Sequence, residues 1–84
     1  MYRIEIKTSA AREIEALPLR DRRRVVDRIG LLAEDPRPAG CEKLAAQDRY
    51  RIRQGDYRIA CSIEDRLLCV WVVKVGHRRD VYRG

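Results

Sequence analysis

The chain has 84 residues, which is enough for a single domain, so we expect residues 1–84 to fold as one unit. Its net charge is +6 at pH 7, and the positive excess lies in the second half. Residues 43–84 contain ten basic and five acidic side chains, against nine and eight in residues 1–42. A basic field of this kind favours nucleic acid or an acidic protein as a partner.

The cysteine and histidine content argues against a metal site. Cys41, Cys61 and Cys69 are odd in number, lack C-x-x-C spacing, and are joined by only one histidine, His77. We therefore expect no metal, no cofactor, and three reduced thiols that pack as small hydrophobic groups in a reducing, cytoplasmic compartment. No stretch is typical of a signal peptide, and the apolar run 67–73 is far shorter than the about 20 residues of a membrane span.

The first third of the chain predicts a strand followed by two helices. Residues 2–6 alternate apolar and charged side chains, which indicates a strand with one buried face. Thr8 or Ser9 is placed to cap the next helix, which Pro18 stops near Leu17. The second helix ends at the segment 35–40, which holds two prolines and a glycine. Its predicted apolar stripe is Val25, Val26, Ile29, Leu32 and Ala33.

A short irregular piece leads into the most informative stretch, a predicted hairpin of strands at about 49–54 and 57–63. Gly55-Asp56 suits a two-residue loop of type II′, with glycine first. This loop sets Arg53 opposite Arg58 and Arg51 opposite Ala60. One face of the hairpin then carries Tyr50, Ile52, Tyr57 and Ile59, and the other carries Arg51, Arg53 and Arg58.

The opposed arginines indicate an anion site. Like charges directly opposite one another in a sheet are destabilising, so Arg53 across from Arg58 calls for a compensating ligand. The guanidinium fork matches phosphate with two hydrogen bonds, and Arg78 lies where it can reach the same surface. The alternative is a basic face that is merely solvated.

The last third predicts a central strand and a polar tail. After a turn at 64–66, residues 67–75 are nearly all apolar, as in a strand covered on both sides, and the tail 76–84 is basic. We expect Trp71, like Tyr50 and Tyr57, to lie in the core, since the alternation does not place these rings on the basic face.

The order β-α-α-β-β-β predicts an α+β domain. We expect an antiparallel sheet with an N-terminal helical hairpin on one face and a basic surface on the other, with the strand order left open. No P-loop, paired-carboxylate motif or nucleophile elbow is present, so an enzyme with this sequence would work through cations and positioning.

Three further features have two readings each. Tyr82 either packs its ring or, near several guanidinium groups, becomes acidic enough to transfer a proton. His77 is either an inert strand-end residue or a proton carrier. The run 22–24 of three arginines is either solvated or contacts a polyanion such as ribosomal RNA.

Three blocks in order along almost the whole chain resemble the RelE/ParE superfamily of bacterial toxin–antitoxin modules, on the RelE side. The blocks are Asp35-Pro36-Arg37-Pro38-x-Gly40-x-x-Lys43-Leu44, Tyr50-Arg51-Ile52-Arg53-x-Gly55-Asp56-Tyr57-Arg58-Ile59 and Val75-Gly76-His77-Arg78-Arg79-Asp80-Val81-Tyr82. The resemblance implies a microbial-RNase-like fold and a metal-independent toxin that cuts mRNA in the ribosomal A site. It also implies a cognate antitoxin, RelB-like or of another family, through which alone the toxin would meet operator DNA.

The resemblance assigns an active site. It implies attack of the ribose 2′-hydroxyl on its own 3′-phosphate, which leaves a 2′,3′-cyclic phosphate and a 5′-hydroxyl. The residues implied by position are Arg51, Arg53, Arg58, Arg78 and Tyr82, and we add His77 as a candidate. The residues that we expect to contact RNA around this site are Arg22, Arg23, Arg24, Lys43, Arg49, Arg79 and Arg83.

Two positions depart from the family pattern. Well-known RelE toxins have lysines where this chain has Arg51 and Arg53, and an arginine effectively cannot act as a base. We therefore expect His77, Tyr82 or the ribosome's own RNA to take the proton. Cys61 replaces a common tyrosine, and we expect only a packing change there. Two rival functions remain, a ParE-like inhibitor of DNA gyrase and an inactive homologue that only binds an antitoxin.

Overall fold

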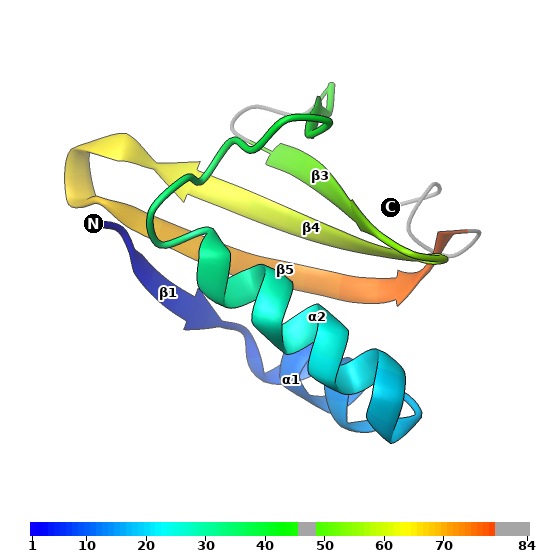
Figure 1. The fold of residues 1–84 in the computed structure, drawn as a ribbon. Coiled ribbons are helices and arrows are strands. Elements are labelled where there is room, and N and C mark those ends of the chain that lie inside the picture. The colour runs from blue at the N-terminus through cyan, green and yellow to red at the C-terminus, as the bar shows by residue number, and fades with distance from the viewer. Residues whose placement is uncertain (46–48, 79–84) are drawn as a thin grey trace.

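The sheet has five strands in the order β1-β5-β4-β3-β2, and two helices lie on one side of it (Figure 1). The computed structural model describes residues 1–45 and 49–78. Along the chain the elements are β1 (Arg3–Ile6), α1 (Thr8–Glu15), α2 (Leu19–Leu31), β2 (Glu42–Lys43), β3 (Arg49–Gln54), β4 (Tyr57–Glu64), a 3-10 turn η1 (Asp65–Leu67) and β5 (Cys69–His77). The α+β class and the order of the main elements are as predicted.

The sheet is mixed, whereas the sequence predicted an antiparallel one. Strands β2 to β5 pair antiparallel, but β1 runs parallel to β5, with Ile4 opposite Val70. A parallel pair needs a long crossover connection, and here the whole segment from α1 to β4 separates the two strands. The first strand, β1, therefore forms one edge of the sheet, next to the last strand, β5.

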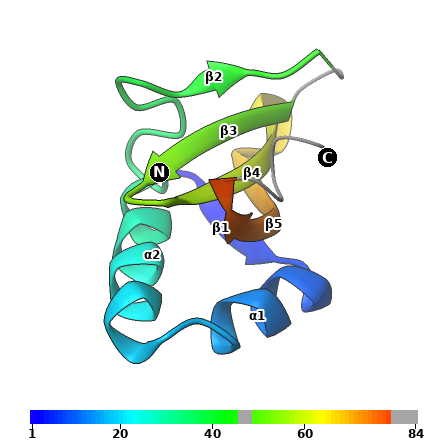
Figure 2. The ribbon, with the colours of Figure 1, turned by 90° about the vertical axis from the view of Figure 1, so that its right-hand side faces the viewer.

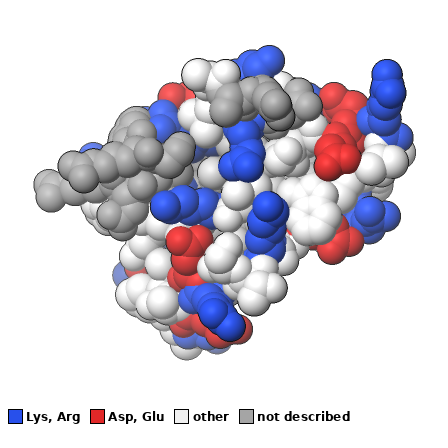
Figure 3. Space-filling view, turned by 180° about the vertical axis from the view of Figure 1, so that it is seen from behind, with Lys and Arg blue, Asp and Glu red and all other residues white. Residues whose placement is uncertain are grey.

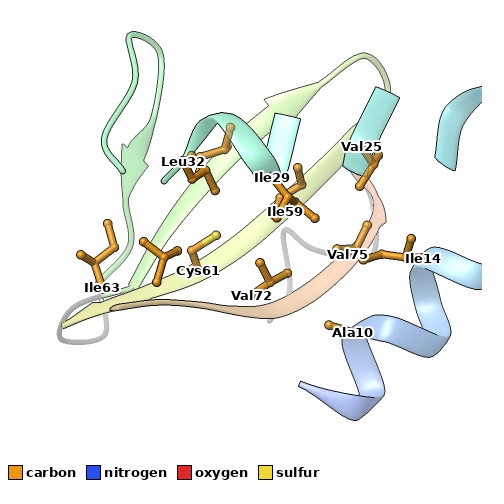
Figure 4. Packing of buried hydrophobic residues seen from close by; sticks show 12 residues of the cluster. Ala10, Ile14, Val25, Ile29, Leu32, Ile59, Cys61, Ile63, Val72 and Val75 are labelled. Atoms are coloured by element: carbon orange, nitrogen blue, oxygen red, sulfur yellow. The ribbon is translucent and has the colours of Figure 1, made fainter. Parts of the chain in front are cut away.

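Both helices cover the same face, which Figure 2 shows edge-on. Val25 and Ile29 of α2, and Leu32 directly after it, project into the core toward Ile59 and the other buried residues of the sheet (Figure 4). Val26 was predicted in this stripe, but it is 49% exposed. It lies one residue, about 100°, around the helix from Val25 and so faces solvent.

The helix boundaries correct one prediction and confirm another. The helix α1 begins at Thr8 with Lys7 as its N-cap, so Thr8 and Ser9 lie inside the helix and the prediction that one of them caps it is wrong. Pro18 does separate the helices, because α1 ends at Glu15 and α2 begins directly after the proline.

The bounds of β5 differ from the prediction at both ends. Leu67 belongs to η1, and Leu68 takes a left-handed conformation with φ of 48°, so the strand begins only at Cys69. At the other end the strand continues through Gly76 and His77, which the sequence placed in the tail. Across residues 1–45 and 49–78, neither helix is long and apolar enough to span a membrane.

A β-bulge lies in the middle of β5. Ala60 of β4 pairs with Lys74, but the next residue, Cys61, pairs with Val72, which leaves Val73 as an extra residue on β5. A bulge of this kind shifts by one the alternation of side chains between the two faces.

This shift overturns the predicted position of Trp71. The register places Trp71 opposite Ser62, on the face that the arginines share, and not in the core. Tyr50 and Tyr57 do pack against the core, as predicted, and both are partly buried.

Candidate functional site

The predicted hairpin register is confirmed residue by residue. Gly55 has a φ of 60°, as the first loop residue of a type II′ turn requires. Arg53 lies opposite Arg58, and Arg58 lies opposite Gly76 on the next strand. The sheet face opposite the helices, which carries Arg51, Arg53 and Arg58, is here called the arginine face. Figure 3 shows this side of the molecule, with lysine and arginine side chains distributed over it.

Arg58 is a buried cation held by its own turn. Its side chain is 5% exposed, and Nη1 donates to the backbone oxygens of Gly55 at 3.1 Å and Tyr57 at 3.0 Å. These carbonyl oxygens fix the position of the guanidinium at the turn end of the sheet. The opposite residue on β5 is Gly76, which adds no side chain beside it.

Arg51 has a different environment from Arg58. It is also buried, at 8% exposure, but its Nη2 donates to Oε2 of Glu42 at 2.7 Å. Glu42 lies directly opposite Arg51 on β2. Sequence analysis missed Glu42, because a strand of two residues has no periodicity to reveal it. The carboxylate balances the charge of Arg51.

Two exposed arginines lie near Arg58. Arg53 pairs with it across the hairpin, and the backbone N–H of Arg78 donates to the carbonyl of Asp56 in the turn at 2.8 Å. Both Arg53 and Arg78 are exposed, while Arg58 is buried between their strands. The turn end of the sheet therefore concentrates positive charge, which can receive a phosphate.

His77 lies on the helix side of the sheet end. It pairs with Tyr57, and the two rings meet edge to face with centroids 6.2 Å apart. The hydroxyl of Tyr57 donates to Asp21 at 3.3 Å, and burial together with this carboxylate raises the pKa of Tyr57. A depression of about 220 Å³ at this point is also lined by Arg24. His77 and Arg58 thus lie on opposite faces of the sheet.

The comparisons with known proteins agree on one family. The family model described as the ParE toxin of the type II toxin–antitoxin system parDE matches residues 4–82. The chain belongs to the RelE/ParE toxin superfamily. Toxin RelG of Mycobacterium tuberculosis is 31% identical over 84 residues, which cover 98% of this chain and 97% of that protein.

Solved RelE structures share the fold. The RelBE2 toxin–antitoxin complex of M. tuberculosis contains a chain that is 29% identical, with a TM-score of 0.81 and coverage of 92% of this chain and 98% of that one. The isolated RelE toxin of Escherichia coli is 24% identical, with a TM-score of 0.81 and coverage of 99% and 93%. The chain is thus a RelE-like toxin of the type II toxin–antitoxin class.

The remaining predicted contacts of this RelE-like toxin divide between two faces. Arg49 shares the arginine face, since it lies two residues from Arg51 on β3. Lys43 pairs with Tyr50 and so lies on the helix side. The helix α2, which carries Arg22, Arg23 and Arg24, is on that side too. Arg79, Tyr82 and Arg83 lie outside the described residues.

The cysteines are free, as predicted, with Cys61 and Cys69 buried and Cys41 half-buried. Within residues 1–45 and 49–78, no group of three or more His, Cys, Asp or Glu residues is arranged to hold a metal ion.

Proposed function

We propose that this RelE-like toxin is an endoribonuclease that cuts mRNA in the ribosomal A site without a metal ion. The observation that carries the proposal is the buried Arg58, fixed by backbone carbonyls beside two exposed arginines at one end of the arginine face. A phosphodiester carries a negative charge, which the positive charges of these arginines attract. The match to Toxin RelG over the whole chain supports the same reading.

The reaction is attack of the ribose 2′-hydroxyl on the adjacent 3′-phosphate, with departure of the 5′-oxygen of the next nucleotide. Negative charge grows on the phosphorus oxygens as the pentacoordinate intermediate forms. Arg58 is already held in position, so it need not reorganise during the reaction. One well-placed donor of this kind lowers the free energy of the transition state by about 2.7–4 kcal/mol. Arg53 and Arg78 add donors, while Arg51, balanced by Glu42, holds β2 beside β3.

The proton of the 2′-hydroxyl needs an acceptor, and an arginine cannot supply one. We assign this role to Tyr82 in its ionised, phenolate form, in preference to His77, because the ring of His77 packs on Tyr57 on the other face of the sheet. Tyr82→Phe should lower the cleavage rate about 10²- to 10⁴-fold, the usual range for general acid–base catalysis. His77→Ala should cleave at nearly the normal rate.

Single-turnover cleavage of ribosome-bound mRNA measures both variants. A large loss in His77→Ala with an active Tyr82→Phe would reverse the assignment. Full activity in both would transfer the role to the ribosome's own RNA.

We further propose that a cognate antitoxin, RelB-like or of another family, neutralises the toxin and alone links it to operator DNA. The support is that similar folds are found in toxin–antitoxin complexes, including the RelBE complex of E. coli and the RelE–RelB complex of Pyrococcus horikoshii.

Cut-site mapping tests the nuclease proposal. The toxin is added to a defined mRNA with and without purified initiated ribosomes, and the new ends are mapped at nucleotide resolution. We expect cuts at the A-site codon only when ribosomes are present, with 5′-hydroxyl ends that ligate only after phosphorylation. Ribosome-independent cuts, or 5′-phosphate ends, would contradict the mechanism.

Gyrase inhibition is the second candidate, since the matching family model carries the ParE description. A supercoiling assay with purified DNA gyrase separates the two candidates. Inhibition of supercoiling without mRNA cleavage would favour the ParE-like function. A protein that is harmless when expressed without an antitoxin would favour the inactive homologue.

A further inference from the structure

A second recess lies on the arginine face, away from the hairpin turn. It is a groove of about 310 Å³, at the small end of the about 300–1,000 Å³ typical of ligand sites. Its lining residues are Lys7, Arg49, Ser62, Glu64, Trp71 and Val73. Among these residues only Arg49 has a role so far, as an expected RNA contact, and the groove itself has none.

The sheet register builds the groove. Arg49, Ser62, Trp71 and Glu5 form one row across β3, β4, β5 and β1, because each pairs with the next. The bulge at Val73 turns Trp71 onto this face, where its ring remains partly exposed. A large aromatic ring that a bulge turns out of the core is available to a ligand.

The charges around the ring suit a nucleic acid. Lys7, directly after β1, and Arg49 of β3 supply two cations at opposite ends of the row. The carboxylate of Glu5 is occupied by Arg3 at 3.0 Å and does not line the groove. Glu64 is the acidic lining residue, and a carboxylate accepts hydrogen bonds from base amino groups, as in cytosine recognition.

We propose that this groove binds one unpaired RNA base, stacked on Trp71, with the flanking phosphates held by Lys7 and Arg49. Aromatic rings beside cations are the standard platform for single-stranded nucleic acids. The inference rests on the proposed function, since Arg49 and Arg53 are four residues apart on β3, about 13 Å along one strand. The base belongs to the same RNA strand that is cut near Arg58.

Trp71 is the only tryptophan of the chain, so its fluorescence reports on the groove directly. The probe is a short RNA oligonucleotide with 2′-O-methyl groups throughout, which has no 2′-hydroxyl to attack and stays intact. We expect saturable quenching of the tryptophan emission as the oligonucleotide is added. Lys7→Ala and Arg49→Ala should each weaken the affinity several-fold, and Leu67→Ala, at a side chain 62% exposed outside the groove, should not.

Anisotropy of a labelled oligonucleotide extends the test to variants without tryptophan. Stacking on an aromatic ring is worth about 1–3 kcal/mol per base, so Trp71→Ala should weaken binding about 5- to 150-fold. Trp71→Phe should retain most of the affinity, and circular dichroism verifies that both variants fold. Binding without quenching, or equal affinity in the alanine and wild-type proteins, would overturn the proposal.

The two proposals fail separately. A toxin that cuts mRNA but shows no quenching would overturn the base site and leave the nuclease assignment intact. Quenching that depends on Lys7 and Arg49, in a protein that never cuts mRNA, would support the base site and overturn the nuclease.

Discussion

Arg58 and Arg51 are both buried on the arginine face, but they lie in different surroundings. Arg58 and Arg51 lie on neighbouring strands with similar exposure, at 5% and 8%, and Nη2 of Arg51 donates to Oε2 of Glu42 on β2. The carbonyls of Gly55 and Tyr57 fix Arg58 in direction. We assign transition-state stabilisation to Arg58 because it lies near the exposed Arg53 and Arg78 at the turn end of the sheet, and a structural role to Arg51 because it joins β3 to β2 through Glu42.

Burial makes Cys61 unreactive. It raises the pKa of the Cys61 thiol to about 12, so almost none of the reactive thiolate is present at neutral pH. In the native protein a thiol reagent such as Ellman's should modify Cys41 quickly and Cys61 only on unfolding, as measured by peptide mass mapping. Rapid modification of Cys61 in the folded Cys41→Ser variant would contradict the burial of this thiol.

Residue-level predictions from sequence succeeded where a local rule sufficed. Gly55 and Asp56 alone determine which residues of the hairpin face each other, so the opposition of Arg53 and Arg58 was predictable. The burial of Arg58 was not, because a local rule gives the register of two paired strands but not the exposure of a side chain. The partner of Arg51 was missed because Glu42 comes from a strand of two residues, which is too short to show a periodic pattern.

At the scale of elements, a polar cluster joins the loop after α2 to the β4–β5 turn. Arg37 donates to both carboxylate oxygens of Asp65, at 3.1 and 3.0 Å, and the hydroxyl of Tyr2 donates to the same group at 2.7 Å. The guanidinium of Arg37 also lies over the ring of Tyr50, 4.9 Å from its centroid. Arg37, in the segment 35–44, therefore has a structural role.

This cluster predicts a loss of stability in acid. The hydrogen bonds from Arg37 and then from Tyr2 lower the pKa of Asp65 below its ordinary 3.8. A carboxyl with a lowered folded-state pKa stabilises the fold above the unfolded value and loses that contribution as the pH falls through the folded one. In urea titrations from about pH 5 to about pH 2, Asp65→Asn should lose less stability than the wild type. Glu34→Gln, at an exposed site, should lose as much stability in acid as the wild type. If Asp65→Asn also lost as much stability as the wild type, the assignment to Asp65 would be refuted.

Sequence analysis misplaced the elements in which apolar and polar residues do not alternate with a regular period. The run 67–75 is almost entirely apolar, so nothing in it marks the bulge at Val73 or the change of face at Trp71. The helix α2 has a clear period, and only Val26, at the edge of its stripe, was placed on the wrong side.

At the scale of the whole molecule, both helices cover one face of the sheet, which leaves the other face open to a ligand (Figure 2). Strand β5 extends past the residues that pair with β1, and there α1 reaches its edge. Oε1 of Glu13 in α1 accepts a hydrogen bond from the backbone N–H of Val75 at 3.0 Å. The sequence predicted correctly that the helices cover one face and that Arg51, Arg53 and Arg58 lie on the other. It could not predict the parallel closure by β1, because pairing between chain ends has no local signal.

The positive field of the molecule, +6 overall, predicts binding that weakens with salt. For single strands the logarithm of the affinity falls with the logarithm of the salt concentration by about 0.7 per phosphate contacted. Arg53→Ala should reduce this slope by about 0.7, measured with the 2′-O-methyl oligonucleotide between about 50 and 200 mM salt. Arg12→Ala, exposed on α1, should leave it unchanged; equal slopes in both variants would remove Arg53 from the phosphate contacts.

The most direct test of the central claim is the single-turnover rate at which Arg58→Ala cuts ribosome-bound mRNA. Arg66→Ala is the matched control, since Arg66 is an exposed arginine in η1, outside the site. The account predicts that Arg58→Ala cuts about 10²- to 10³-fold more slowly than the wild type while it still folds and binds the antitoxin, and that Arg66→Ala cuts normally. A near-normal rate in a folded Arg58→Ala protein would show that this buried cation does not stabilise the breaking phosphodiester.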